Sequence, residues 1–228
     1  MSNFIEINNV SFKYKKGRTV FDNFSLTLNT EENTVLTGNN GSGKTTLSKL
    51  IMGILKPQRG EIKILGRDSS SLSLGQAGEL IGYVYQYPER QLFAMSVIEE
   101  LTFPLVTKGV LPETALKEAE EMIEIFELDK VKDSYPFFLS YGEKRRLAIA
   151  SVLMNKPKFL ILDEPTASLD KERIESLNKL LDTLSAKKTG ILAISHDEEF
   201  IERYGQRIIK IEGGKIISDT ISANRSSN

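Results

Sequence analysis

The sequence contains no cysteine and no tryptophan, and His196 is its single histidine in 228 residues. A chain without cysteine forms no disulfide, no cysteine-ligated zinc site and no catalytic thiolate, and an intracellular setting is natural for it. The sequence also has no window near 18 consecutive apolar residues, so we expect no helix that spans a bilayer. Any membrane role must therefore come through a partner.

A secretory signal and a strong net charge are missing as well. Residues 1–6 contain neither a basic region nor an apolar stretch, so no signal peptide is visible. Thirty basic and 31 acidic side chains give a formal net charge of −1. No overall field therefore favours direct binding to nucleic acid or to an anionic membrane.

The remaining composition is that of an ordinary globular protein, with 40% apolar and 27% charged residues. The length suits one large domain, or one domain with an insertion. Apolar runs and alternation predict strands at 4–8, 20–28, 34–37, 61–65, 80–85, 159–162 and 191–195, and a terminal hairpin over 207–218. Helical spacing predicts helices after residue 43, after 96, over 112–126, over 140–154 and from 174 to a stop at Gly190.

Buried strands that alternate with helices predict an α/β fold with a mixed, mostly parallel sheet. We expect an N-terminal antiparallel β subdomain and an inserted α-helical subdomain within a single domain over 1–228. The core would comprise 1–86 and 157–228, and the helical subdomain 87–156.

A glycine-rich stretch, Gly38-Asn39-Asn40-Gly41-Ser42-Gly43-Lys44-Thr45-Thr46, follows one strand and opens a helix. It fits the phosphate-loop pattern G-x-x-x-x-G-K-[ST] in the required context. Glycines allow successive backbone N–H groups to point inward at a polyphosphate, and the helix dipole adds positive potential. We expect Lys44 to reach the β- and γ-phosphates and the Thr45 hydroxyl to ligate Mg²⁺. The alternative is a turn that only starts a helix.

Polar residues follow several buried strands, where ligands of parallel sheets bind. Gln86, Asp163 and His196 each come directly after an apolar run, and Glu164 follows Asp163. Asp163 would hold Mg²⁺ opposite Thr45. Glu164 would take a proton from attacking water. The alternative is that the two acids merely end a strand at the surface.

The segment Leu139-Ser140-Tyr141-Gly142-Glu143 has capping-box spacing at a helix start. It is a second helix N-terminus suited to an anion. One subunit could not easily bring this helix to the far side of its own phosphates, but a second copy could. The alternative is a helix cap with no further role.

These motifs, in order and spacing over residues 14–196, resemble the nucleotide-binding subunits of ATP-binding cassette (ABC) transporters. The resemblance implies a RecA-like P-loop NTPase fold and an ATPase in which two subunits enclose two ATP molecules with Mg²⁺. It implies Tyr14 stacking on adenine, Gln86 sensing Mg²⁺ and water, Glu164 as base and His196 at the γ-phosphate. Ser140, Gly142 and Glu143 would act in trans, and residues 168–170 would communicate across the dimer.

A narrower resemblance lies in Gln86-Tyr87-Pro88-Glu89-Arg90-Gln91-Leu92-Phe93, followed by Val97-Ile98-Glu99-Glu100. This segment is similar to the ATPases of energy-coupling factor (ECF) transporters and their cobalt and nickel relatives. The resemblance implies membrane subunits docking near 86–100, a peripheral location on the cytoplasmic face, and import of a vitamin or transition-metal ion. Generic packing of the helical subdomain is the alternative.

Two features depart from the family pattern. Tyr141 replaces the signature's usual first glycine, which could impair one site of a heterodimer, and Glu143 replaces its usual glutamine. The chain also stops soon after the predicted hairpin, so we expect a monomer until ATP bridges a homodimer or heterodimer.

Other functions fit less well. A GTPase would need N-K-x-D, and Asn155-Lys156-Pro157-Lys158 lacks the aspartate. A small-molecule kinase has no use for the 139–143 segment. A soluble cassette ATPase acting on ribosomes or DNA stays open as the alternative function, although such proteins generally carry two cassettes or a long coiled-coil insertion.

Overall fold

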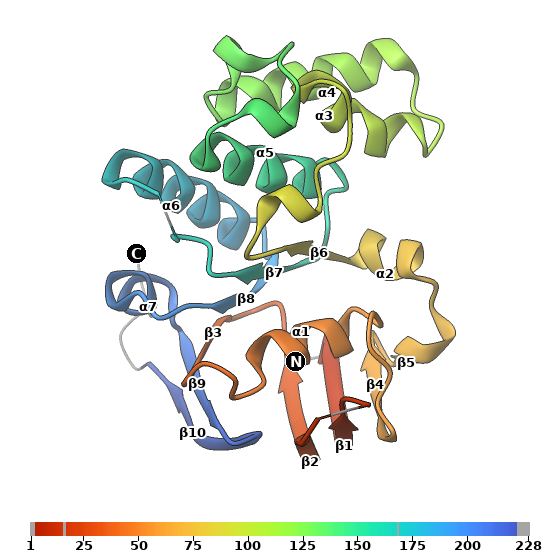
Figure 1. Ribbon diagram of the computed structural model, residues 1–228, viewed down its shortest axis with the longest axis vertical. Coiled ribbons are helices and arrows are strands. Elements are labelled where there is room, and N and C mark those ends of the chain that lie inside the picture. Colours follow the sequence, from red (N-terminus) through yellow and green to blue (C-terminus); the bar gives the residue numbers. More distant parts are fainter. Residues whose placement is uncertain (1–2, 16, 168, 223–228) are drawn as a thin grey trace. The chain divides into compact units, whose positions relative to one another are not determined.

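The computed structural model describes residues 3–15, 17–167 and 169–222. The chain forms two compact units. The sheet unit comprises Met1–Tyr83, Lys158–Pro165 and Leu184–Asn228, and the helical unit comprises Val84–Pro157 and Thr166–Thr183. Figure 1 labels the elements of both units along the chain.

The sheet unit contains an antiparallel sheet with strand order β2-β1-β4-β5. Its strands are β1 (Ile5–Lys13), β2 (Thr19–Leu28), β4 (Arg59–Ile64) and β5 (Arg67–Asp68). Alternate side chains of β2 are buried from Phe24 to Leu28, as the period of two in the sequence predicts. β1 extends to Lys13, past the predicted end at residue 8, because residues 10–13 also pair with β2.

The second sheet has the order β10-β9-β3-β8-β7-β6. Its strands are β3 (Asn33–Thr37), β6 (Ile81–Val84), β7 (Phe159–Asp163), β8 (Gly190–Ile194), β9 (Arg207–Glu212) and β10 (Lys215–Ile221). β3 pairs in parallel with β8 and β9, and β7 pairs in parallel with β8. Every residue of β7 and β8 is buried. This sheet therefore aligns the carboxyl ends of β3, β7 and β8 along one edge.

The described part of the sheet unit contains the helices α1 (Lys44–Ile51), α2 (Leu74–Leu80) and α7 (Glu198–Tyr204). The sequence prediction missed α2 and α7, since seven residues are too few to show helical periodicity. Each nevertheless begins at a capping side chain, Ser73 for α2 and Asp197 for α7.

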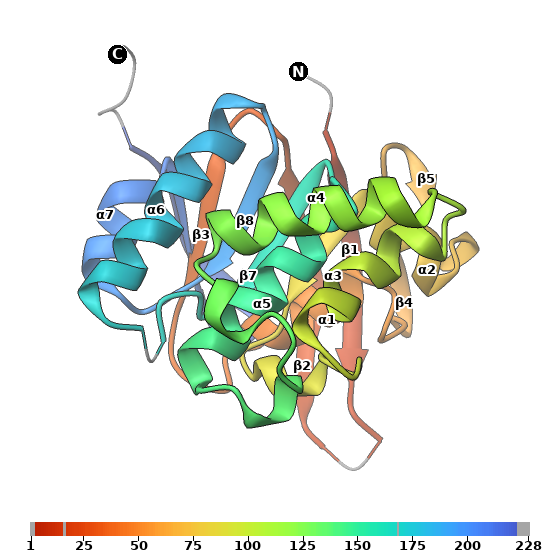
Figure 2. The same cartoon turned by 90° about the horizontal axis from the view of Figure 1, so that it is seen from above.

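The helical unit contains α3 (Val97–Val106), α4 (Pro112–Ile125) and α5 (Tyr141–Met154), which pack against one another (Figure 2). α6 (Lys171–Ala186) belongs to this unit as far as Thr183. Single 3-10 turns lie at Ser69–Ser71, Pro88–Arg90, Asp129–Val131 and Pro136–Phe138. Helical spacing over 112–126 predicts a buried stripe that includes Leu116. That prediction was wrong at Leu116, which is 44% exposed, because the buried face of α4 runs through Ala115, Ala119 and Ile123.

The predicted stop of α6 at Gly190 was also wrong. The helix ends at Ala186, and the left-handed residue after it is Lys188, with φ of 60°. Gly190 instead starts β8, where a Cβ atom would lie 2.5 Å from the Phe159 ring. Close packing against the neighbouring strand, and not helix termination, therefore requires this glycine.

Candidate functional site

The predicted phosphate loop connects the end of β3 at Thr37 to α1. The helix begins after Gly43, which makes no side-chain cap. The first N–H groups of α1 are thus left to bind an acceptor other than a capping side chain. The structure places a helix N-terminus without a side-chain cap where the sequence predicts that the phosphate loop opens a helix.

Two loop positions accept only glycine. At Gly38, φ is 134° and a Cβ atom would lie 2.0 Å from the Ile211 carbonyl oxygen. At Gly43, φ is 113° and a Cβ atom would lie 2.7 Å from the Phe21 ring. The loop is therefore shaped by close contacts with β9 and β2 as well as by its own backbone freedom.

Lys44 is almost fully buried, and its Nζ donates hydrogen bonds to two carbonyl groups of its own loop. The distances are 2.5 Å to the Gly38 oxygen and 3.1 Å to the Asn39 oxygen. Burial lowers the pKa of Lys44, and the nearby carboxylates of Glu164 and Asp163 oppose that change. A positive charge is thus held inside the loop.

Thr45 and Asp163 bring the first turn of α1 to the end of β7. The Thr45 hydroxyl donates a hydrogen bond of 3.0 Å to Asp163 Oδ2, and the Tyr83 hydroxyl donates to the same oxygen at 3.5 Å. A hydroxyl and a carboxylate are hard oxygen ligands of the kind that Mg²⁺ prefers beside phosphate groups. The residues present therefore fit a magnesium ion.

Glu164 directly follows β7 in a left-handed backbone conformation, with φ of 53°. Such a conformation is uncommon for residues other than glycine and costs ~1 kcal/mol or more, so it is often retained where function needs it. The Glu164 amide is fixed by a 2.9 Å hydrogen bond to the Ile194 carbonyl. Nothing in the sequence indicates this backbone turn.

His196 follows β8 and lies beside Glu164, with 3.5 Å between His196 Nε2 and Glu164 Oε1. Burial raises the pKa of the Glu164 carboxyl, and Asp163 adds to the rise, while His196 and Lys44 oppose it. A carboxylate with a raised pKa accepts a proton more readily than an exposed one. The sheet unit thus brings together Lys44, Asp163, Glu164 and His196.

Tyr14 lies near the far end of the phosphate loop. Its hydroxyl shares a 3.2 Å hydrogen bond with Thr46 Oγ1, and its ring packs edge-on against Phe12. The side chain is 42% exposed. The structure therefore places an accessible aromatic ring beside the loop.

The remaining predicted site residues belong to the helical unit. Ser140 caps α5 in a capping box, accepting from the Glu143 amide at 3.3 Å while Glu143 Oε2 accepts from the Ser140 amide at 2.8 Å. The Ser140 hydroxyl also donates to this carboxylate and lowers the pKa of Glu143. Gly142 occupies the first turn of α5. Of residues 168–170, Ser168 lies outside the described residues, and Asp170 pairs with Arg173.

Gln86 lies two residues after β6, and its backbone carbonyl accepts hydrogen bonds from Tyr141 and Arg145 of α5. Sequence reasoning missed Arg145, because arginine is usually exposed and this one is fully buried. It also missed Tyr83, although a tyrosine in a buried strand needs a partner for its hydroxyl and so carried a signal.

The segment before α3 is held by acidic side chains. Glu100 is buried, and its Oε2 accepts from the amides of Phe93 and Ala94 at 2.9 and 2.8 Å. Burial raises the pKa of this carboxyl, and the two amides oppose the rise. The ordered segment leaves Phe93 58% and Met95 72% exposed. Apolar surface is thus presented on a fixed backbone.

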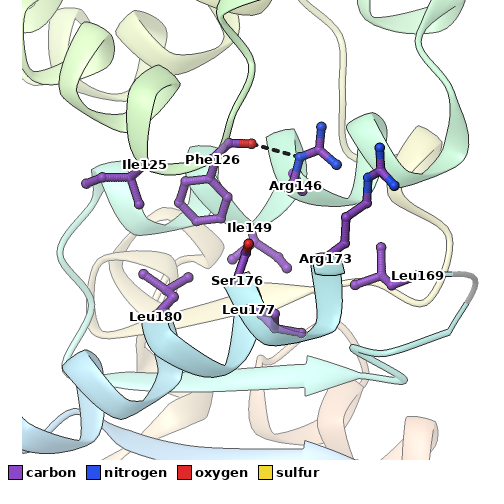
Figure 3. Close-up of a pocket in the computed structure, with 9 residues that line it drawn as sticks. All are labelled: Ile125, Phe126, Arg146, Ile149, Leu169, Arg173, Ser176, Leu177 and Leu180. Carbon is purple, nitrogen blue, oxygen red and sulfur yellow. Dashed lines mark hydrogen bonds between the residues drawn. The ribbon is translucent and has the colours of Figure 1, made fainter. Parts of the chain in front are cut away.

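A hollow in the helical unit lies between the end of α4, α5 and α6 (Figure 3). Apolar side chains line most of it, with the guanidinium groups of Arg146 and Arg173 on one side. Arg146 donates to the carbonyls of Phe126 at 2.7 Å and Glu127 at 3.3 Å. Because these carbonyls end α4, Arg146 acts as a C-terminal cap that fastens α5 to α4.

Within residues 3–15, 17–167 and 169–222, no helix combines the length and the apolar character needed to cross a membrane.

Comparison with known proteins gives concordant matches. The family model described as ABC transporter matches residues 21–167. The energy-coupling factor transporter ATP-binding protein EcfA2 of Caldanaerobacter subterraneus subsp. tengcongensis is 39% identical over 220 residues, covering 93% of this chain and 77% of the relative.

Solved structures agree. The ATP-binding cassette MJ0796, a dimer in a post-hydrolysis state with ADP and Pi, matches with a TM-score of 0.87 at 28% identity, covering 95% of this chain and 98% of the other. CbiO1 from Clostridium perfringens, part of the ABC transporter complex CbiONQ, matches with a TM-score of 0.84 at 29% identity, covering 97% and 89%.

Proposed function

The chain belongs to the ABC transporter family as an ATP-binding, ATP-hydrolysing subunit, and from that premise we propose that it powers an ECF-type importer of a vitamin or a transition-metal ion. Its ATP-binding core comprises 1–86 and 157–228, and 87–156 forms the subdomain that meets membrane partners. The protein is peripheral, on the cytoplasmic face of the membrane. The match to EcfA2 and the exposed apolar segment before α3 support this proposal.

The observation that carries the chemistry is the position of Glu164 beside His196 at the ends of neighbouring strands. Glu164 is the general base: its half-buried carboxylate takes a proton from the water that attacks the γ-phosphorus of ATP. His196 contacts the γ-phosphate. Phosphoryl transfer needs positioning of the reactants and neutralisation of phosphate charge. The Lys44 ammonium group inside the loop supplies the neutralisation.

The phosphate loop, Gly38 to Thr46, binds the phosphates through its backbone, and Tyr14 stacks on the adenine. Thr45 and Asp163 would hold Mg²⁺, with Gln86 sensing the ion and the attacking water. The ion, when bound, supplies neutralisation of phosphate charge. Asp163 and Thr45 already share a hydrogen bond of 3.0 Å, which supports their joint role.

A second ABC ATPase subunit completes each site in trans with Ser140, Gly142 and Glu143. The capping box between Ser140 and Glu143 supports this role, because it fixes the first turn of α5. ATP then closes the dimer, and hydrolysis lets it reopen. Because membrane subunits dock near 86–100, closure moves their helices.

The test is isolation of the protein from membranes with its partners, followed by identification of the small molecule that those partners bind. Recovery of integral membrane subunits that bind a vitamin or a transition-metal ion is the expected result. Recovery on ribosomes or DNA, with no membrane subunit, would instead favour a cassette ATPase with a non-transport partner.

A further inference from the structure

Tyr141 occupies the signature position where the family usually has glycine, and its side chain points back to the Gln86 backbone. The Tyr141 hydroxyl donates a 2.8 Å hydrogen bond to the Gln86 carbonyl. Arg145, one turn later on α5, donates to the same carbonyl at 2.8 Å and to the Tyr141 hydroxyl at 3.2 Å. Two donors on one face of α5 therefore share one acceptor on Gln86.

This acceptor lies outside regular secondary structure. β6 ends at Val84 and the next 3-10 turn begins at Pro88, so no strand or helix ladder holds the Gln86 carbonyl. The side chains of Tyr141 and Arg145 therefore hold a carbonyl that belongs to no strand or helix. The neighbouring residue is held in the same way, because the Gln91 side chain accepts from the Tyr85 amide at 2.9 Å.

Arg145 alone would hold the Gln86 carbonyl less firmly than Arg145 and Tyr141 do together. The Arg145 guanidinium is completely buried and also donates to the Tyr85 carbonyl at 3.4 Å, so the Gln86 carbonyl does not have this group to itself. The Tyr141 ring lies 5.7 Å from the guanidinium carbon, and its hydroxyl accepts from Arg145 while donating to Gln86. The phenol thereby orients the guanidinium and adds a second hydrogen bond to the carbonyl. Glycine at this position offers neither contact.

We propose that Tyr141 is a positioning residue that fastens the Gln86 backbone to the first turn of the signature helix α5. A displacement of the helix then carries the Gln86 side chain with it, and a displacement of Gln86 carries the helix. The inference rests on the proposed function, which gives Gln86 and the signature residues their roles in ATP hydrolysis. Tyr141 acts through Gln86 and need not touch ATP.

The test is Tyr141→Phe in the full chain, because this variant keeps the ring and loses only the hydroxyl. We expect kcat for ATP hydrolysis to fall about fivefold, as the loss of one hydrogen bond implies, with KM for ATP unchanged because the phosphate loop is intact. Amide hydrogen exchange should rise over 85–91 and stay the same in α4. If turnover requires a different second ATPase subunit, kcat is measured in that complex, and exchange is measured on the full chain alone.

Tyr135→Phe is the matched control: it removes the same atom from a half-buried tyrosine whose ring packs on Phe137. It should leave both readouts unchanged. Tyr141→Gly should lower kcat at least as far as Tyr141→Phe. The proposal is overturned if Tyr141→Phe has the amide hydrogen exchange and the kcat of the wild type. It is also overturned if Tyr141→Gly has a higher kcat than the wild type, because Tyr141 would then obstruct hydrolysis. If wild type hydrolyses ATP while Glu164→Gln does not, the proposed function stands even when this inference fails.

Discussion

Glu164 and His196 meet because the strands that precede them are neighbours in register. Asp163, the last residue of β7, lies opposite Ile194 at the end of β8, so the residues that follow emerge at the same edge of the sheet. The result is a carboxylate oxygen 3.5 Å from an imidazole nitrogen. The base and the γ-phosphate contact that we propose are therefore positioned by the sheet itself.

Glu164→Gln should keep ATP binding and lose nearly all turnover, because an amide cannot accept the proton from water. ATP should then trap a dimer that elutes early on a sizing column. Nucleotide affinity, phosphate release and elution volume test this directly. Glu199→Gln, an exposed change in the first turn of α7, is the control and should behave like wild type. Normal turnover in Glu164→Gln would remove Glu164 as the base.

The same substitution should raise thermal stability at neutral pH. Burial raises the pKa of Glu164 in the folded state. The favourable contribution of Glu164 to the free energy of unfolding is complete below the ordinary carboxyl pKa of about 4.3, and it is lost as pH rises through the folded-state pKa. Glu164→Gln should therefore unfold at a higher temperature than wild type at pH 7, with the difference shrinking near pH 4. A wild type that is more stable at pH 7 would contradict this assignment.

Lys44→Ala should lose both ATP binding and hydrolysis. The variant removes the positive charge and also the two hydrogen bonds that hold the loop carbonyls of Gly38 and Asn39. Lys49→Ala, on the same helix and outside the loop, is the control that should bind ATP normally. Hydrolysis at the wild-type rate in Lys44→Ala would refute the phosphate-loop interpretation.

The Mg²⁺ dependence of ATP hydrolysis should show whether the Thr45 hydroxyl is a ligand of the ion. Chelation of divalent cations should abolish turnover, and Thr45→Ala should need more Mg²⁺ for half-maximal activity because one oxygen ligand is gone. Thr45→Ser keeps the hydroxyl and should restore the wild-type Mg²⁺ titration. The assignment fails if Thr45→Ala and wild type titrate identically.

Phe93→Asp should release the membrane partners while leaving the fold and ATP binding intact, since Phe93 is 58% exposed and its ring meets Phe103 edge-on. Co-purification from membranes is the measurement. Leu111→Asp changes an apolar residue at the start of α4 that is more exposed than Phe93, and it should leave the partners bound. Retention of the partners by Phe93→Asp would place the docking surface elsewhere.

Much of this arrangement was accessible from the sequence. The predicted α/β P-loop fold is confirmed by the match to solved structures. It could be predicted because buried strands and helix caps such as Ser140 leave strong local patterns in the sequence. Three features could not be predicted. The left-handed turn at Glu164 depends on a hydrogen bond to a distant strand, and the burial of Arg145 depends on carbonyl groups 59 and 60 residues away. The direction of the Tyr141 side chain depends on the Gln86 carbonyl alone of these two. Such tertiary contacts have no periodic signature.

The hydrogen bonds from Lys44 to two carbonyl groups of the phosphate loop affect how tightly this loop can bind a ligand. Fixing the backbone of one residue costs ~1–2 kcal/mol in conformational entropy. If a flexible loop became ordered only when a ligand bound, this cost for each ordered residue would weaken the binding free energy. Here the ammonium group, together with the tight contacts of Gly38 and Gly43, keeps the loop curved through interactions internal to the protein. If ATP binds here as we propose, it meets a loop that is already curved, and little chain entropy is lost on binding.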